Sequence, residues 1–102
     1  MSDTQQVEVR PTVGSIVKSL NQLGMHGVHA LLVEKSVKGR RRTTMSCPIA
    51  NYVRAETGID VMVGGSWLKE VDHVERRYDF SDSVADFVSA FDGGQFGDLL
   101  DV

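Results

Sequence analysis

Cysteine is nearly absent from this chain, and long apolar runs are missing altogether. The single cysteine, Cys47, cannot form an internal disulfide bond, which is typical of proteins in a reducing cytoplasm. Apolar runs such as residues 30–33 are far shorter than the roughly 20 apolar residues that span a membrane. Residues 1–11 are polar and lack the apolar region of a secretory signal. We therefore expect a cytoplasmic protein without a membrane partner.

Familiar catalytic and cofactor-binding motifs are also missing. The chain has no Ser/His/Asp order, no distinctive pair of carboxylates and no dinucleotide-binding fingerprint. Gly64-Gly65 has no Lys-Ser/Thr behind it, so it predicts a turn or bulge instead of a phosphate loop. The spacing of His26 and His29 would place both on one face of a helix. A metal site would need a further ligand, such as His73 or Asp72, and the sequence spacing of these residues is typical of no known metal site. We predict no catalytic residue, no metal and no cofactor.

Charge is divided unevenly along the chain. All eleven Lys and Arg lie in residues 1–78 together with eight acids, whereas residues 79–102 hold six Asp and no base. The segment from Lys35 to Arg54 contains six bases and no acid. Two interpretations stay open. Either the basic and acidic parts attract each other, within the fold or between copies, or one of them meets a charged partner.

Hydrophobic spacing of i, i+3, i+4 and i+7 predicts helices in the first half of the chain. The first runs from about residue 12 to Gly24, and the second from Gly27 to Lys38, where Gly39 would end it. Residues 39–46 then form a basic polar loop.

Two further helices have clear start and stop signals. One begins near Cys47, with that residue or Ser46 at the N-cap and Pro48 in the first turn, and Gly58 closes it. The last helix has Ser81 or Ser83 as its cap and Gly93-Gly94 as its stop. Its buried stripe consists of Val84, Phe87, Val88 and Phe91.

The stretch between these two helices is rich in β-branched and aromatic residues and alternates in part, which predicts strands over 59–64, 66–71 and 74–80. After the last helix, a short turn should fold back on the core. The fold class is therefore α+β: three N-terminal helices, a small antiparallel sheet of two or three strands, and one C-terminal amphipathic helix. Residues 12–102 form this single domain and 1–11 a flexible N-terminus.

Cys47 is the candidate nucleophile. A thiol at a helix N-terminus, near Arg40, Arg41 and Arg42, would favour the thiolate. Cys-Pro at a helix start also occurs in thioredoxin-like proteins, but here no buried strand precedes it and no resolving cysteine is present. The alternative is a small, partly buried cap residue.

The basic segment and one tryptophan are the candidate binding residues. Lys38 and Arg40–Arg42, with Lys35, could bind phosphates near the N–H groups of the next helix. The acidic pI, near 5.5, and the absence of interleaved aromatics favour a solvated loop or a site for an acidic protein. Trp67, like Tyr78 and Phe80, would by default pack on the last helix. If its side chain instead pointed outward, Trp67 would be a binding hot spot.

Two motifs support a comparison: Cys-Pro-Ile-Ala-x-Tyr at 47–52 and Phe-Val-x-x-Phe-Asp-x-Gly at 87–94. Together they resemble a family of small uncharacterised proteins from actinobacteria and their phages. The resemblance spans about residues 35–100 and departs from the family at Gly97-Asp98, where a proline is usual. It implies that Cys47-Pro48 and Asp92-x-Gly94 are structural caps, and it implies no activity.

The leading hypothesis is a non-catalytic protein-interaction module. It would dock to a protein partner, or to itself, through residues 38–42 or through the sheet face around Trp67. One alternative is nucleic-acid binding through residues 35–42. The other is a thiol-based redox or enzymatic activity at Cys47.

Overall fold

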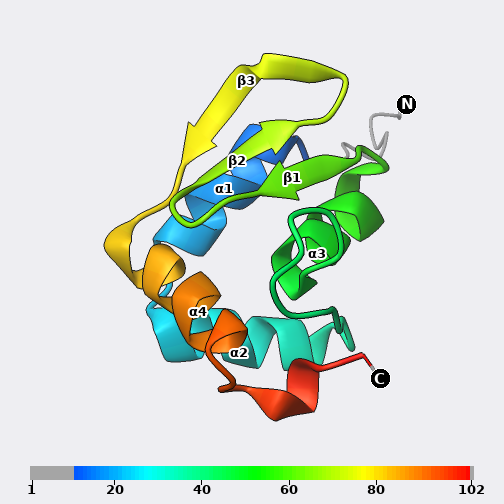
Figure 1. The fold of residues 1–102 in the computed structure, drawn as a ribbon. Coiled ribbons are helices and arrows are strands. Elements are labelled where there is room, and N and C mark those ends of the chain that lie inside the picture. Colours follow the sequence, from blue (N-terminus) through cyan, green and yellow to red (C-terminus); the bar gives the residue numbers. More distant parts are fainter. Residues whose placement is uncertain (1–10, 102) are drawn as a thin grey trace, which may run out of the picture.

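The computed structural model describes residues 11–101, and the predicted flexible N-terminus falls almost entirely outside them. The elements follow in the order α1 (Val13–Asn21), α2 (Met25–Glu34), α3 (Pro48–Thr57), β1 (Val61–Val63), β2 (Trp67–Glu70), β3 (His73–Asp79), α4 (Asp82–Asp92) and a 3₁₀ turn, η1 (Gly97–Leu99) (Figure 1). The three strands form one antiparallel sheet in the order β1-β2-β3. The predicted α+β class and the order of its elements are confirmed; β1 and β2 are shorter than expected, and β3 has the expected length but begins one residue earlier.

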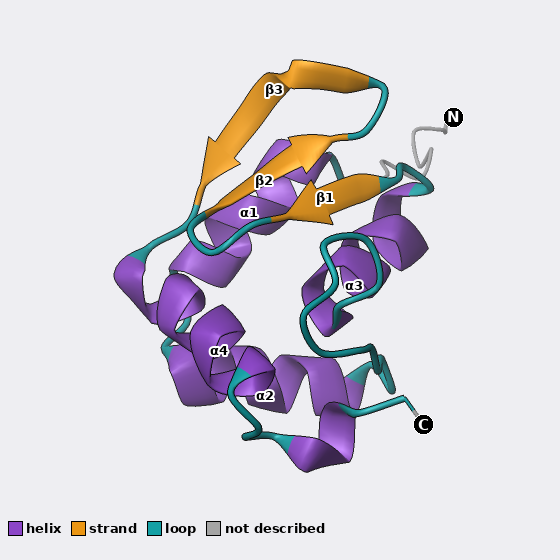
Figure 2. Ribbon diagram, viewed as in Figure 1, coloured by secondary structure: helices purple, strands orange, loops and turns teal. Residues whose placement is uncertain are grey.

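The sheet lies at one end of the molecule and the α2–α4 pair at the other (Figure 2). Helix α1 crosses behind the sheet in Figure 1 and packs against β3, while α3 packs against β1. Between these layers lies a core of buried apolar side chains, the largest of which are Phe87, Phe91, Leu20, Leu32, Ile49, Leu68 and Leu99.

Strand alternation assigns each side chain of the sheet to one of two faces. Val61 and Val63 of β1 and Leu68 of β2 are buried against the helices. Met62 is therefore on the opposite face, where it lies directly across from Lys69, because cross-strand partners share a face. We call this second surface, away from the helices, the outer face of the sheet.

The predicted helix caps are confirmed where the signal is local. Cys47 is the N-cap of α3, Pro48 follows it, and Gly58 ends the helix with φ of 76°. Ser81 caps α4, and its hydroxyl accepts a hydrogen bond from the Val84 N–H. At the start of α1, Thr12 forms a reciprocal capping box with Ser15.

The predicted end of the second helix is wrong. Helix α2 begins two residues earlier than expected, after Gly24, and ends at Glu34 instead of Lys38. Ser36 adopts the left-handed conformation, with φ of 57°, and the Val37 N–H donates to the Leu32 carbonyl at 3.0 Å. This is the arrangement that usually employs glycine, so the sequence carried no signal for it.

The aromatic packing also differs from the default prediction. The ring of Phe87 stacks with Phe91 and Phe96 of the C-terminal part, at centroid distances of 6.4 and 5.1 Å. Of the three sheet aromatics, Phe80 is buried in the core, whereas Trp67 lies on the outer face. Tyr78 lies beside Gly14 of α1.

Candidate functional site

The basic segment lies against the acidic C-terminal segment. Gly39 bridges to Leu100: the Gly39 N–H donates to the Leu99 carbonyl at 2.8 Å, and the Asp101 N–H donates to the Gly39 carbonyl at 2.8 Å. Gly39 is needed for this packing, because a Cβ there would lie 2.4 to 2.6 Å from backbone atoms of residues 46–48. The two segments therefore meet within the fold through backbone hydrogen bonds. Among residues 11–101, no Lys or Arg of residues 35–54 lies within ion-pair distance of an Asp of residues 79–101, so their charge attraction stays a prediction.

Arg41 and Arg42 are engaged at the C-terminal end of α4. The Arg41 Nε donates to the Phe91 carbonyl at 2.8 Å, and its Nη2 donates to the carbonyls of Gly94 and Gln95 at 3.1 and 3.2 Å. The Arg42 backbone N–H donates to Asp92 Oδ1 at 2.8 Å. Cations near the last carbonyls of a helix offset its dipole and satisfy acceptors that lack partners. Arg41 thus has a structural role, which sequence spacing could not indicate.

Lys38 and Arg40 lie differently. Both side chains are exposed, and the hydrogen bonds of these residues within the described part of the chain are made by their backbone: the Arg40 N–H donates to the Ser46 carbonyl, and the Lys38 carbonyl accepts from Asn51. The five bases predicted to line up along phosphates are therefore divided between intramolecular contacts and solvent.

Cys47 is buried at the start of α3, with 5% of its surface exposed. Its Sγ accepts a hydrogen bond from the Ala50 N–H at 3.5 Å. Burial raises the pKa of the Cys47 thiol, and the nearby Asp92 carboxylate raises it further. The N–H groups of Ala50 and Ile49 lower the pKa, but by less than burial raises it. A buried, protonated thiol matches the interpretation as a cap residue and disfavours a nucleophile.

Trp67 lies on the outer face, partly exposed, with its indole flat across Gly64. A Cβ on Gly64 would come within 2.4 Å of indole Cε2, so only glycine permits this contact. The Lys69 Nζ lies 4.8 Å from the centroid of the indole ring, a cation–π distance. The ring is therefore fixed from two sides while part of it still faces solvent.

Cations surround this tryptophan on the outer face. Lys69 pairs across the strands with Met62 on one side and Arg77 on the other. The Arg77 Nε contacts Asp79 Oδ1 at 2.9 Å, so its charge is partly offset. Sequence analysis singled out Trp67 but missed Met62 and Lys69, whose position follows from the alternation of buried valines in β1 and its register with β2.

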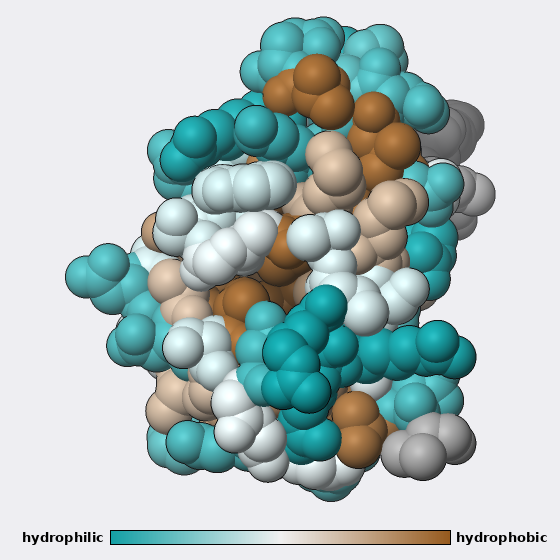
Figure 3. Space-filling model, in the orientation of Figure 1, coloured by the Kyte–Doolittle hydropathy of each residue, from teal (hydrophilic) through white to brown (hydrophobic). Residues whose placement is uncertain are grey.

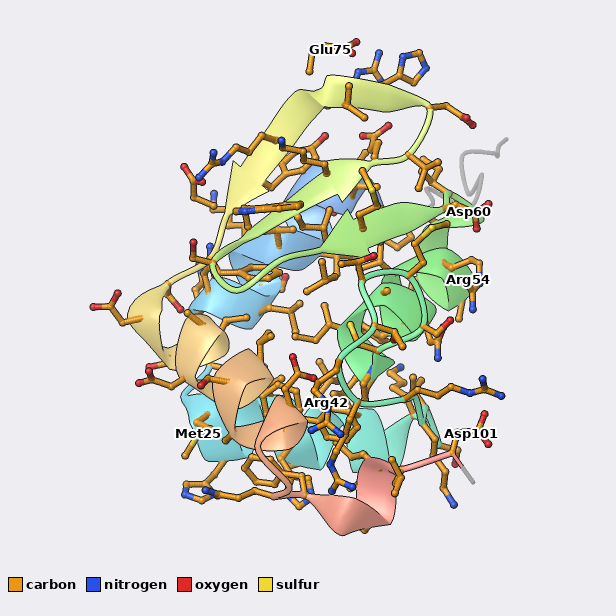
Figure 4. The ribbon with its side chains drawn as sticks, in the orientation of Figure 1. Met25, Arg42, Arg54, Asp60, Glu75 and Asp101 are labelled. Carbon is orange, nitrogen blue, oxygen red and sulfur yellow. The ribbon has the colours of Figure 1, made fainter. Side chains whose placement is uncertain are left out.

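A hollow of about 290 Å³ opens where residues 42–44, the β1–β2 turn and the end of α4 meet. Cys47, Val63 and Val88 contribute its apolar lining, and Figure 3 shows brown, hydrophobic atoms set back in the middle of this face. Arg42, placed between α4 and the segment that leads into α3 (Figure 4), belongs to its rim. Gly64 also lines the hollow, so the hollow and the Trp67 indole share one residue.

The predicted absence of a metal site concerned His26, His29 and His73. His29 Nε2 lies 2.8 Å from Asp98 Oδ2 and the ring lies 4.7 Å from that of Phe96, so His29 fastens the C-terminal segment to α2. His73 is exposed near Glu75. Among residues 11–101, no three His, Cys, Asp or Glu are grouped so that they could hold a metal ion.

Sequence analysis also missed Glu70, the buried charged residue of β2, with 4% of its surface exposed. Its carboxylate accepts a hydrogen bond from the Tyr78 hydroxyl at 2.9 Å and lies 3.4 Å from Arg76 Nη1. It alternates with Trp67 and Lys69 along β2, which is the signal that places it on the inner face. These partners explain its burial without a ligand.

In comparisons with known proteins, the chain matches no protein-family model, no curated protein and no solved structure. The resemblance to actinobacterial and phage proteins stays a prediction. Within residues 11–101, every helix is too short or too polar to cross a membrane. We therefore infer function from the geometry of this chain.

Proposed function

We propose that this protein is a non-catalytic protein-interaction module whose contact surface is the outer face of the sheet around Trp67. The observation that carries the proposal is that the single tryptophan of the chain lies there partly exposed, held between Gly64 and Lys69. Tryptophan is enriched among residues that dominate binding energy. A ring already fixed in place loses little conformational freedom when a partner covers it.

The surroundings of the indole favour a protein over a small polar ligand. Met62 offers a flexible apolar side chain beside it, and Met is common at surfaces that accept varied partners. Lys69 and Arg77 add cations on the same face. An apolar centre with charged neighbours is the usual composition of a protein interface.

The two alternative functions find less support. Arg41 uses three hydrogen bonds on the α4 terminus, so the run of three arginines is not wholly available to phosphates. Cys47 is buried and its pKa is raised, which opposes thiolate chemistry at neutral pH.

A cross-linking experiment tests the proposal. A photoreactive amino acid replaces Met62 on the outer face, and Gln22, exposed at the end of α1, is the matched control position. After irradiation in extracts of the cells that make the protein, mass spectrometry identifies the attached chain, including a second copy. We expect a defined product from position 62 and none from position 22.

The captured protein is then purified and its affinity measured. We expect Trp67→Ala to weaken binding at least tenfold, about 1.4 kcal/mol, Trp67→Phe to retain most of it, and Gln22→Ala to leave it unchanged. Equal cross-linking from both positions, or an unchanged affinity for Trp67→Ala in a folded variant, would overturn the proposal.

A further inference from the structure

We infer that the hollow beside Trp67 receives one apolar side chain from an acidic segment of the protein partner. This inference rests on the proposed function, and it specifies what the partner presents: a short stretch in which an aromatic or aliphatic residue is flanked by Asp or Glu.

Continuity with the tryptophan is the first reason. Gly64 lines the hollow and also lies under the indole of Trp67, so the two are adjacent: the indole lies on the outer face, and the hollow opens at the edge of the sheet next to α4. A segment that covers the indole therefore reaches the hollow with its next side chain. Interfaces commonly combine an aromatic contact with a neighbouring pocket that receives an anchor residue.

The lining is the second reason. Val63 and Val88 are apolar, and the Cys47 Sγ already accepts a hydrogen bond from the Ala50 N–H. Thr43 and Thr44 also line the hollow: the Thr43 hydroxyl donates to the Arg40 carbonyl, and Thr44 is exposed, so its hydroxyl can stay hydrated when an apolar side chain enters. The volume of about 290 Å³ compares with about 150 Å³ for an engineered apolar cavity that binds benzene. It holds a Phe or Leu side chain easily.

Charge is the third reason, and it selects an acidic segment. Within residues 11–101, no carboxylate lies within ion-pair distance of the Arg42 guanidinium or the Lys69 ammonium. Asp92 on the rim is the opposing charge: its Oδ1 accepts from the Arg42 backbone N–H, its backbone carbonyl accepts from Arg42 Nη1, and its carboxylate keeps its negative charge. The chain as a whole carries −3. At physiological salt, exposed charges farther than about 8 Å away are largely screened. The local balance is then two cations, Arg42 on the rim and Lys69 over the indole, against one carboxylate, Asp92, which favours an acidic segment.

A peptide titration of the full chain tests the inference. The probes are four capped pentapeptides: Asp-Glu-Phe-Asp-Glu, the same peptide with Leu or with Ala at its centre, and Lys-Lys-Phe-Lys-Lys. Binding is followed by the ¹⁵N–¹H spectrum, including the Trp67 indole. We expect the Phe and Leu acidic peptides to shift the amide signals of Gly65 and Val88. We expect the Ala-centred and the basic peptide to bind at least tenfold more weakly.

Blocking the hollow gives the matched comparison. Gly65 lines the hollow and a Cβ added there meets no atom within 4 Å, so Gly65→Leu places a bulky side chain at the hollow without a clash, and we expect it to obstruct entry. Gly24, at the start of α2, is equally unobstructed and does not line the hollow, so Gly24→Leu is the control. We expect Gly65→Leu to weaken the acidic Phe peptide at least tenfold, and Gly24→Leu to leave its affinity unchanged.

Several results would overturn the inference. They are no shift at about 1 mM acidic peptide, equal binding of the basic peptide, or equal binding to Gly65→Leu. The inference is also overturned if the amide signals of the residues that line the hollow shift with protein concentration in the absence of peptide, because a second copy of the chain would then occupy the hollow. If binding is lost in Trp67→Ala but survives in Gly65→Leu, the hollow is not used and the proposed role of the sheet face stands. Failure of the cross-linking from position 62 would instead remove the proposed function itself.

Discussion

Two adjacent arginines, Arg40 and Arg41, should contribute very differently to stability. Replacing Arg41 by alanine removes three hydrogen bonds to carbonyls at the end of α4 and a guanidinium 5.2 Å from the Phe91 ring centroid. Replacing Arg40, its exposed neighbour, removes no side-chain hydrogen bond seen among the described residues. The two variants lose the same side chain from adjacent positions, so their difference measures the contacts of Arg41.

The magnitude follows from where each acceptor lies. The bond to the Phe91 carbonyl is partly buried, and leaving such an acceptor unsatisfied costs about 1–3 kcal/mol. The bonds to Gly94 and Gln95 are exposed, so water replaces the donor at little cost. The cation–π contact adds about 0.5–1 kcal/mol. Arg41→Ala should therefore lower the free energy of unfolding by about 1.5–4 kcal/mol, out of about 5–15 kcal/mol for a domain of this size.

Thermal and denaturant unfolding are the assays. Each kcal/mol corresponds to about 4–8 °C in Tm for a small domain, so Arg41→Ala should lower Tm by roughly 6–30 °C. Arg40→Ala should change the free energy by less than about 0.5 kcal/mol. Arg41→Lys should recover less than half of the lost unfolding free energy. Its ammonium keeps the charge near the helix end but cannot donate to several carbonyls at once as the planar guanidinium does. If Arg41→Ala and Arg40→Ala are equally stable, Arg41 does not cap α4.

Three further outcomes follow from the structure. Gly39→Ala should cost about 3 kcal/mol in unfolding free energy, because its Cβ would clash with the backbone at the start of α3. Gly65→Ala, with open space around it, should be nearly neutral, and denaturant midpoints measure the difference. Cys47 should alkylate slowly at pH 7 in the native protein and quickly after unfolding, and a fast native rate with a midpoint below pH 8.5 would contradict its burial. Burial and the neighbouring Glu70 raise the pKa of Tyr78, so the stability contributed by its protonated hydroxyl is complete below about pH 10 and is lost as the pH rises above that value. The unfolding free energy of the unmodified protein should therefore fall more steeply over that range than that of Tyr78→Phe.

The sequence predicted well those elements whose signals are local. The α4 stripe, the Ser81 cap and the Gly93-Gly94 stop lie within one short window, and so do the Cys47-Pro48 start and the Gly58 end of α3. A helix boundary of this kind depends on a few consecutive residues. The end of α2 was predicted wrongly because it lacks such a local signal: Ser36 occupies the left-handed position at which glycine usually ends a helix.

The candidate site depended on contacts that spacing does not reveal. Arg41 reaches the Phe91 carbonyl across 50 residues of sequence, so an apparently solvated basic loop is in part a helix cap. The direction of Trp67 was left open, and the register of β2 with β1 decided it. Gly64 could have indicated the outcome, because a glycine opposite an aromatic in a neighbouring strand is often covered by that ring.

Charge segregation along a chain need not imply a charged partner. Here the basic segment around Gly39 and the acidic C-terminus form a parallel bridge, and Arg41 and Asp92 connect them to α4. These parts of the sequence therefore meet through backbone groups and the Arg41 guanidinium, and among the described residues no ion pair joins a base of residues 35–54 to an Asp of residues 79–101. The charges that matter for a partner are those that lie beside apolar surface. Lys69 lies over the partly exposed indole of Trp67, and Arg42, whose guanidinium also donates to the Asp92 carbonyl, lies at the rim of the apolar hollow. The surface most suited to binding is thus not the most basic stretch of the sequence but the place where unpaired charge and exposed apolar surface coincide.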